Sequence, residues 1–418
     1  MSIVGSAGSG LGGAGDSGGP LGSFYSHTLD QSLKFDSARS TVLTRTATTP
    51  TDGKKATWSF WIKKSEVTTS SGSYKSIFYA GSPNSDGFRM GFRKLAGYHN
   101  HEFTITMDNG SSAAHIFKYT DAVYRDPSSW YHFVIRYDST DSTAADRIKL
   151  YVNSTQQTFS SGTNVSPSLN RIPTFQVSGK TQRIGEGRTD VNEHINAYLA
   201  ELHFVDGQAL DPSSFGETKD GIWVAKEYSG SHGDNGFYLT FQATGTGTTA
   251  QGTTAQTNIG DDQSGEGHNF AVSALVASDV VPDSPTNNFA TLNPLHTYWN
   301  TSYPPTISEG NLKTYTASNY WATTLGTMGV SSGKWYAEFI VTTGASAALA
   351  AIGILDIGAG NPMDTSSYFI GVETNSVSYY GSNGTKYITS TASAYGNTWG
   401  LGDIIGVALD LDAGTVKF

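Results

Sequence analysis

The sequence predicts an all-β protein in which antiparallel sheets pack face to face as sandwiches. Aromatic residues make up 12% of the chain and charged residues only 15%, so strands rich in Tyr, Phe, Val and Thr dominate over solvated helices. Glycine is frequent, and it falls between these apolar runs as turn residues do. No long stretch shows the period of an amphipathic helix. A length of 418 residues leaves room for two or three such domains.

The clearest prediction is a hairpin between Trp130 and Asn153. Its first strand places alternate side chains on one face, namely Tyr131, Phe133, Ile135 and Tyr137. Its second strand does the same with Ile148, Leu150 and Val152. The connector between them is rich in Asp, Ser and Thr, as a solvated loop should be. A hairpin with one strongly apolar face has to bury that face against a second layer, so the hairpin predicts a sandwich.

Further strands of the first domain follow from alternation and turn residues. In chain order they are expected at residues 32–35, 57–62, 76–80, 87–92, 101–107, 181–185 and 197–205. A short helical turn is expected where Pro212 follows Asp211, because proline is favoured at the first helical position. A second β domain begins after Phe289, with strands expected at residues 333–340, 351–354, 368–372, 376–380 and 402–418.

Two segments lack such strands. Residues 1–32 are rich in Gly and Ser and are expected to form a tail that orders only on a partner, with Pro20, Leu21, Phe24 and Tyr25 as its apolar anchors. Residues 243–288 are rich in Gly, Thr and Ala and are expected to form an extended linker between the domains. A calcium loop is the alternative for part of that linker, at Asp261, Asp262 and Glu266, but the spacing lacks the alternating ligands of a known loop.

Composition excludes several classes of protein. The net charge of −10 opposes binding to a phosphate backbone, so we expect no nucleic-acid partner. The chain has no cysteine, which excludes disulfide-stapled modules and thiolate metal sites. No run approaches 18 apolar residues, so we expect no membrane span, and no signal peptide is recognisable at the N-terminus.

The tail contains a string, Gly15 to Leu21, that matches the sequence around the nucleophilic serine of chymotrypsin-like proteases. That chemistry needs a serine held rigidly in a folded barrel beside an oriented histidine. Here Ser17 lies in a Gly-rich tail and precedes the only matching histidine motif, at His115, which reverses the order of that family. We therefore interpret the string as a chance match.

The ordered set of strand motifs resembles the laminin-G-like, concanavalin A-like domains. The motifs that carry the resemblance are Leu33 to Asp36, Trp58 to Ile62, Trp130 to Phe133, Leu150 to Asn153, Ile184-Gly185 and Ala197 to Val205. The resemblance implies a jelly-roll sandwich over residues 33–242. Residues 289–418 resemble a SPRY domain, which is a second sandwich of this kind. The motifs that carry this resemblance are Gly333 to Phe339, Ile352 to Ile354 and Gly402 to Phe418. Domains of the SPRY family mostly bind proteins or peptides, and this one is expected to need further strands beyond Phe418.

The expected architecture is therefore two tandem concanavalin A-like jelly-roll sandwiches after a Gly-rich tail. Four segments also resemble structural proteins of tailed bacteriophages that carry the same laminin-G-like domain. They are Pro20 to His27 in the tail and residues 125–132, 283–289 and 291–295. This resemblance implies a virion component, a tail or head fibre or appendage anchored by residues 1–32 to other virion proteins. A homo-oligomer is expected, for which a trimer is one fitting arrangement. The alternatives are a decoration or cementing protein without receptor binding, and a non-viral adhesin or lectin.

The sequence offers candidates for glycan binding but none for catalysis. Tyr98, His99, Asn100 and His101 form a loop with the residue types that contact sugars, although a solvated turn explains them as well. A sandwich glycosidase needs two carboxylates that flank one glycosidic bond. Glu193 and Glu201 lie near one strand without the spacing of such a pair, so we expect no enzyme, no cofactor and no metal site.

Overall fold

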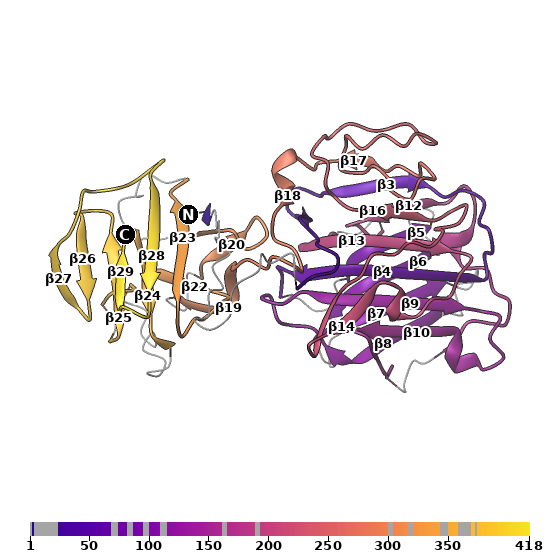
Figure 1. The fold of residues 1–418 in the computed structure, drawn as a ribbon, viewed down its shortest axis with the longest axis horizontal. Helices are drawn as coiled ribbons and strands as arrows, with labels where there is room; N and C mark the ends of the chain where they lie inside the picture. Colours follow the sequence, from indigo (N-terminus) through magenta and orange to yellow (C-terminus); the bar gives the residue numbers. More distant parts are fainter. Residues whose placement is uncertain are drawn as a thin grey trace. The chain divides into compact units, whose positions relative to one another are not determined.

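The structure is a computed structural model that describes residues 2–3, 24–67, 74–81, 87–94, 100–108, 115–160, 165–188, 193–299, 304–316, 321–342, 350–357, 369–372 and 374–418. The chain divides into two compact units, one formed by Gly19–Asn288 and one by Met1–Gly18 with Phe289–Phe418 (Figure 1). Nearly all regular structure is antiparallel β, as predicted. Among the described residues, no helix is long and apolar enough to cross a membrane.

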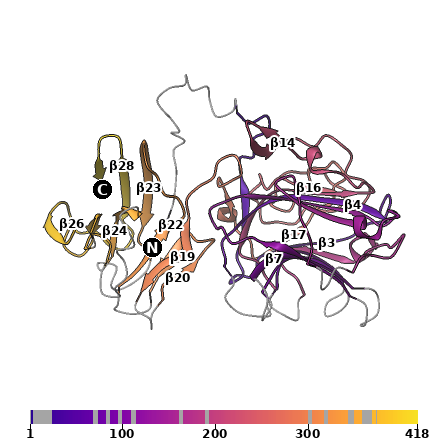
Figure 2. The same cartoon turned by 90° about the horizontal axis from the view of Figure 1, so that it is seen from below.

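The unit Gly19–Asn288 is a sandwich of two sheets, seen edge-on in Figure 2 with β4 and β16 in one layer and β3, β17 and β7 in the other. The eight-stranded sheet has the order β11-β10-β9-β4-β13-β2-β18, with β16 also paired to β13. Its strands are β2 (Ser32–Phe35), β4 (Lys55–Lys64), β9 (Tyr131–Asp138), β10 (Ile148–Val152), β11 (Thr155–Gln156), β13 (Ala197–Asp206), β16 (Phe237–Leu239) and β18 (Val280–Val281).

The seven-stranded sheet has the order β17-β3-β12-β5-β6-β7-β8. Its strands are β3 (Val42–Thr46), β5 (Tyr74–Gly81), β6 (Gly87–Lys94), β7 (Asn100–Asp108), β8 (His115–Val123), β12 (Thr181–Ile184) and β17 (Ala271–Ser273). The connections hold a small hairpin, β14 (Gly216–Lys219) with β15 (Ile222–Ala225), and the 3-10 turns η2 (Ala144–Arg147), η3 (Thr174–Gln176), η4 (Pro212–Ser214) and η5 (Ala277–Asp279). The turn η4 confirms the helical turn expected at Pro212.

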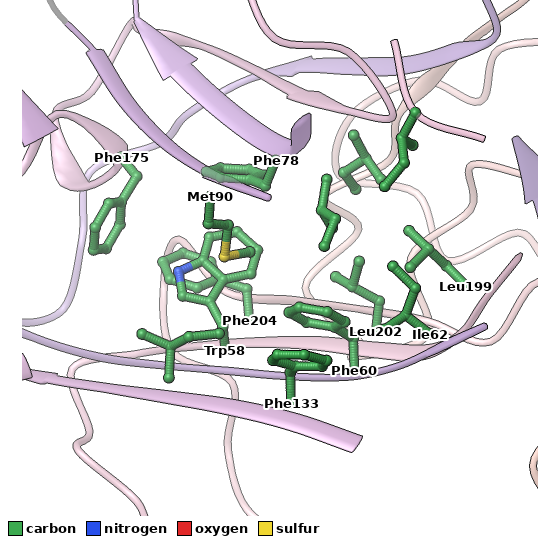
Figure 3. Packing of buried hydrophobic residues seen from close by; sticks show 14 of the residues in the cluster. Trp58, Phe60, Ile62, Phe78, Met90, Phe133, Phe175, Leu199, Leu202 and Phe204 are labelled. Carbon is green, nitrogen blue, oxygen red and sulfur yellow. The ribbon is translucent and has the colours of Figure 1, made fainter. Parts of the chain in front are cut away.

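The core between the two sheets is aromatic (Figure 3). Trp58 of β4 stacks on Phe204 of the same sheet, with ring centroids 4.3 Å apart, and meets Phe78 of the opposite sheet at 4.1 Å. Beside it, Phe60 and Phe133 stack at 5.7 Å. Burial of such rings is the main source of stability available to a cysteine-free chain.

The predicted hairpin is confirmed. Strands β9 and β10 pair antiparallel, with Leu150 opposite Ile135 and Val152 opposite Phe133. The apolar residues predicted for one face of each strand all line the core, apart from Tyr131, which is half-buried and packs against it. The reason is the two-residue period of the strand, which sends every second side chain into the same layer.

Residues 243–288 do not form the extended linker that the sequence predicted; they fold onto the first sandwich. Ile259, Phe270 and Leu275 enter its core, β17 extends the seven-stranded sheet and β18 extends the eight-stranded sheet. Buried Asp279 also accepts hydrogen bonds from Arg39 at 2.5 and 2.9 Å. A few well-spaced apolar residues therefore outweigh the Gly- and Thr-rich composition, and the unit extends to Asn288 rather than ending near residue 242.

The described residues of the second unit form three sheets. The six-stranded sheet has the order β20-β21-β1-β23-β28-β29, formed by β1 (Ser2–Ile3), β20 (Thr306–Ser308), β21 (Lys313–Tyr315), β23 (Lys334–Ile340), β28 (Ile404–Asp410) and β29 (Thr415–Lys417). The four-stranded sheet holds β24 (Ala351–Leu355), β25 (Ser376–Tyr380), β26 (Thr385–Ile388) and β27 (Thr391–Ala394). The third sheet pairs β19 (Leu292–Trp299) with β22 (Ala322–Gly326).

The core of this unit joins the six- and four-stranded sheets through Val341, Ile352, Tyr379, Trp399, Ile405 and Val407. The expected strands at 333–340, 351–354 and 376–380 are present, and the stretch 402–418 forms the hairpin β28–β29. Most of the strand expected at 368–372 forms turns where it is described. The sequence did not predict β1, in which Ser2 pairs with both Lys313 and Ile340.

The folded state of residues 243–288 can be tested by proteolysis. Chymotrypsin should cut slowly after Phe270, whose side chain is fully buried, and substitution Arg39→Gln should accelerate that cut, because it leaves the buried Asp279 carboxylate with fewer partners. The exposed Arg125 supplies the control, Arg125→Gln. Mass spectrometry of the fragments gives the rate. Rapid cleavage after Phe270 in the unsubstituted chain would contradict the docked arrangement.

Candidate functional site

The outer face of the seven-stranded sheet gathers arginines and aromatic rings. Along β6, Phe88, Met90 and Phe92 point into the core, so Arg89 and Arg93 point to the opposite side. We define the arginine–aromatic face as Tyr74, Arg89, Arg93, Phe117, Arg183 and Glu193.

The register of four strand pairs places part of this face in one continuous row. Arg183 of β12 lies opposite Tyr79 of β5, and Tyr79 lies opposite Arg89 of β6. Arg89 in turn lies opposite Thr106 of β7, which lies opposite Phe117 of β8. Neighbouring strands are about 4.8 Å apart, so the row brings polar and aromatic side chains from five strands onto one surface.

A loop after β12 adds an acidic group to this face. The carboxylate of Glu193 accepts a hydrogen bond from Arg89 Nη1 at 2.9 Å and another from the backbone N–H of Arg188 at 3.0 Å. The Glu193 backbone carbonyl accepts from the N–H of Ser76 in β5 at 3.0 Å, which ties the loop to the sheet. Gly187 is needed here, because a Cβ at that position would lie 1.9 Å from Glu193 Oε2.

The two arginines of β6 share one ring. The guanidinium carbons of Arg89 and Arg93 lie 3.9 and 4.5 Å from the centroid of Tyr74, and that of Arg93 lies 5.2 Å from the centroid of Phe117. Such cation–π contacts hold the long side chains against the sheet. Tyr74, Arg89, Arg93 and Phe117 all remain partly exposed to solvent. The face can thus offer planar cations, a carboxylate and aromatic surface to one ligand.

The outer face of the eight-stranded sheet carries a different polar cluster, in which the side chains bond to one another. An irregularity in β13 between Ala200 and His203 turns Glu201 toward the outside, with φ +47°. The Glu201 carboxylate contacts His27 Nε2 at 2.5 Å and accepts a hydrogen bond from the Tyr238 hydroxyl at 3.1 Å. Glu193 and Glu201 therefore lie on opposite outer faces of the sandwich, although they are close in sequence.

Charge explains the protonation of this cluster. Burial alone would raise the pKa of the Glu201 carboxyl, but the hydrogen bonds and charges of His203 and His27 lower it to about 2. The hydrogen bond to Glu201 raises the pKa of His27, against the opposing effect of burial. Burial, together with the nearby His203, lowers the pKa of His232 to about 3. Glu201 and His27 therefore form an ion pair beside a neutral histidine.

A buried Ser–His contact on the same face is structural. His132 Nε2 lies 2.8 Å from Ser59 Oγ, while its Nδ1 accepts a hydrogen bond from Trp223 Nε1 at 3.0 Å. Because Nδ1 is an acceptor, the neutral ring carries its proton on Nε2 and donates it to Ser59. A general base would have to accept the serine proton at that nitrogen, so this arrangement does not activate Ser59.

The structure describes only some of the residues that were predicted to have a function. Pro20, Leu21, Tyr98 and His99 lie outside the described residues. Asn100 begins β7, and His101 is only 4% exposed, with Nδ1 3.4 Å from Lys64 Nζ, so its ring presents no face to solvent. Phe24 and Tyr25 are half-buried and pack edge to face at 5.0 Å.

The alternative calcium loop is held together by its own hydrogen bonds. Asp262 accepts from the backbone N–H groups of Tyr238, Ser264 and His268, at 2.8 to 2.9 Å. Asp261 Oδ2 accepts from Thr257 and Asn258. Within the described ranges, no group of three or more acidic or histidine side chains could hold a metal ion.

The arginine–aromatic face was not predicted from the sequence, although a signal for it was present. The run 88–93 alternates Phe, Met and Phe with Arg, Gly and Arg, so two arginines on the face opposite the core follow from the period of the strand. The contribution of Glu193 could not be read from its own strand, since it depends on the loop after β12.

The ion pair on the eight-stranded sheet gives a prediction for His27. Its imidazole should titrate above pH 6.5, and Glu201→Gln should return the pKa toward 6.5, as followed by NMR. Because the pKa is raised in the folded state, the stabilisation from His27 should be complete below pH 6.5 and lost as the pH rises through the folded value. His232, with its lowered pKa, serves as the internal control and should stay neutral over this range. An unshifted His27 would refute the pair.

Comparison with known proteins identifies two domains in the chain. Residues 36–214 match the model of the concanavalin A-like lectin/glucanases superfamily, in its laminin G-like form, and residues 334–418 match the SPRY domain. No curated protein matches the chain.

Solved structures show limited similarity. A heptameric SAP-like pentraxin from Limulus polyphemus shares 18% identity over 44% of this chain and 78% of its own, with a TM-score of 0.31. A putative carbohydrate-binding protein from Bacteroides ovatus shares 13% over 59% and 58%, with a TM-score of 0.34. Tailspike protein 2 of Escherichia coli O157:H7 bacteriophage CAB120 shares 10% over 45% and 27%, with a TM-score of 0.28. The two domain matches show that the chain carries a laminin G-like domain of the concanavalin A-like superfamily, followed by a SPRY domain.

Proposed function

We propose that the laminin G-like domain binds a glycan on the arginine–aromatic face. The observation that carries the proposal is that Tyr74, Arg89, Arg93 and Phe117 are partly exposed together on the outer face of the seven-stranded sheet, with the Glu193 carboxylate paired to Arg89. Sugars offer apolar C–H faces that pack on rings and hydroxyls that pair with planar polar groups. The match to a superfamily of lectins and glucanases supports the same ligand class.

We propose that the domain binds the glycan without hydrolysing it. A glycosidase places two carboxylates on either side of one bond, roughly 5–10 Å apart. Glu193 and Glu201, the two acids considered from the sequence, lie on opposite outer faces with the core of the sandwich between them, so they cannot flank one bond. Glu193 is engaged with Arg89, which suits a positioning role for that arginine.

Phe117→Ala tests the proposed face. The ring is partly exposed and carries no structural hydrogen bond, so its loss should weaken glycan binding about tenfold while the domain stays folded. Tyr151→Ala is the matched control, since it removes a partly exposed ring in β10 of the other sheet. A glycan array identifies ligands and calorimetry gives the affinities. Equal losses in both variants, or binding to no glycan, would reject the proposal.

The second part of the proposal concerns where the protein acts. We take it to be a virion component, a fibre or appendage whose sandwich contacts a host-surface glycan, as the resemblance to tailed-phage structural proteins implies. The geometry of residues 24–32 supports this reading. Leu29 is buried, and both its N–H and its carbonyl bond Thr286 Oγ1, at 3.0 and 2.8 Å. A particle that held Pro20, Leu21, Phe24 and Tyr25 would thus be linked firmly to the sandwich.

The anchor can be tested on purified particles. Joint substitution of Leu21, Phe24 and Tyr25 by Ser should release the protein from particles, because it removes apolar docking groups, while thermal unfolding of both units stays nearly unchanged. Immunogold labelling of particles measures occupancy and location. Label at an appendage tip supports host attachment, and label over the head supports the decoration alternative. An unlabelled particle, or full occupancy by the variant, would refute the anchored virion role.

A further inference from the structure

The outer face of the six-stranded sheet exposes large apolar side chains. Seventeen large apolar or aromatic side chains are exposed among the described residues, and eleven of them belong to the smaller unit, Met1–Gly18 with Phe289–Phe418. Two of these, Ile404 of β28 and Tyr336 of β23, are 61% and 46% exposed. Apolar surface that is concentrated on one part of a protein marks an interaction surface.

Strand β28 lies at the centre of this surface, between β23 and β29 (Figure 1). Ile405 and Val407 point from β28 into the core, so the even-numbered residues of β28 point outward. The registers of the two strand pairs then identify the outward residues of β23 and β29. We call this surface the β28 patch, and its residues are Tyr336, Glu338, Ile340, Ile404, Gly406, Ala408 and Lys417.

The β28 patch is flat, which suits packing against another sheet. Gly406 has no side chain, and the Tyr336 ring lies over it, since a Cβ at Gly406 would lie 2.7 Å from Tyr336 Oη. The Tyr336 hydroxyl donates a hydrogen bond to Glu338 Oε1 at 2.8 Å, which holds the ring down. Two sheets pack face to face about 10 Å apart with their strands nearly aligned, and a flat face leaves few gaps in such a contact.

The patch carries charges of both signs. Glu338 and Lys417 form no ion pair with any residue that the structure describes, whereas Lys334 and Asp410 pair with each other at one end of the patch. The next charge on this face, Lys313, lies beyond β1, two strands away from β23. A partner with a single sign of charge would leave either Glu338 or Lys417 unmatched. A second copy of the chain offers a partner to both.

We propose that the β28 patch joins two copies of this chain about a two-fold axis parallel to β28. Because β23 and β29 flank β28, this axis places β23 of each copy over β29 of the other. Ile404 then meets its own copy, and Lys417 of one chain lies near Tyr336 and Glu338 of the other. Asp410 also approaches its own copy, but its charge is already paired within each chain. This contact does not depend on the proposed glycan binding or on the virion role.

Sedimentation equilibrium of the full-length chain tests the contact. The unsubstituted chain should form dimers, and Ile404→Asp should weaken dimerisation at least about thirtyfold, because it buries a carboxylate without a partner. Ile388→Asp is the matched control, since Ile388 is 44% exposed in β26 of the four-stranded sheet. Thermal unfolding verifies the fold of each variant. A monomer at every concentration, a trimer, or equal losses in both variants would overturn the two-fold contact.

A mixing experiment tests the pairing of the two charges. Glu338→Lys and Lys417→Glu should each weaken dimerisation at least about tenfold when present alone, because like charges then face each other. An equimolar mixture of the two variants should dimerise again, since opposite charges then meet at both contacts. Lys386→Glu, a charge reversal in β26, is the control and should leave dimerisation unchanged. A mixture that associates no more strongly than either variant alone would overturn the proposed pairing.

Discussion

The burial of β4 between its neighbours is the constraint on which the first unit depends. Trp58, Phe60 and Ile62 point inward and are almost wholly buried, and their rings and side chains meet those of both sheets. Because a strand alternates with a period of two, fixing this set also fixes what faces outward, namely Ser59, Trp61 and Lys63. The core therefore determines which side chains lie on the outer faces of the sandwich. A shift of β4 by one residue would expose the apolar side chains that now fill the core.

Much of this arrangement could be predicted, because alternation is a local property of the chain. The hairpin from Tyr131 to Val152, the Trp58 strand and the strand ending at Val205 all follow from period-two patterns with turn residues around them. The second unit was recognisable for the same reason at Lys334 to Ile340. Short-range pattern carries this information, since each of these strands buries its own apolar side chains.

The features that the sequence did not predict depend on contacts between distant residues. Phe270 lies in a Gly- and Thr-rich segment with no strand pattern, and its burial depends on a core built from other parts of the chain. Glu193 joins the arginine–aromatic face only through a loop that crosses Ser76 and Arg89. His101 was predicted to lie in an exposed sugar-binding loop, but its ring is buried beside Lys64. In each case the partner is far away in sequence, and local composition does not identify it.

The two outer faces of the sandwich differ in how far other segments of the chain cover their polar groups. On the eight-stranded sheet, Glu201 meets His27 and Tyr238, and Lys63 meets Asp283 and Asn288 at 2.8 Å. These partners come from the N-terminal segment, from β16 and from residues 283–288. On the seven-stranded sheet, Arg89 pairs with Glu193 and Arg183 with Glu186, but no segment of the described chain covers the rings of Tyr74 and Phe117 completely. The polar groups of the eight-stranded face are therefore covered by other segments of the chain, whereas Tyr74, Arg89, Arg93 and Phe117 stay partly exposed, which is why the proposed glycan-binding face lies on the seven-stranded side.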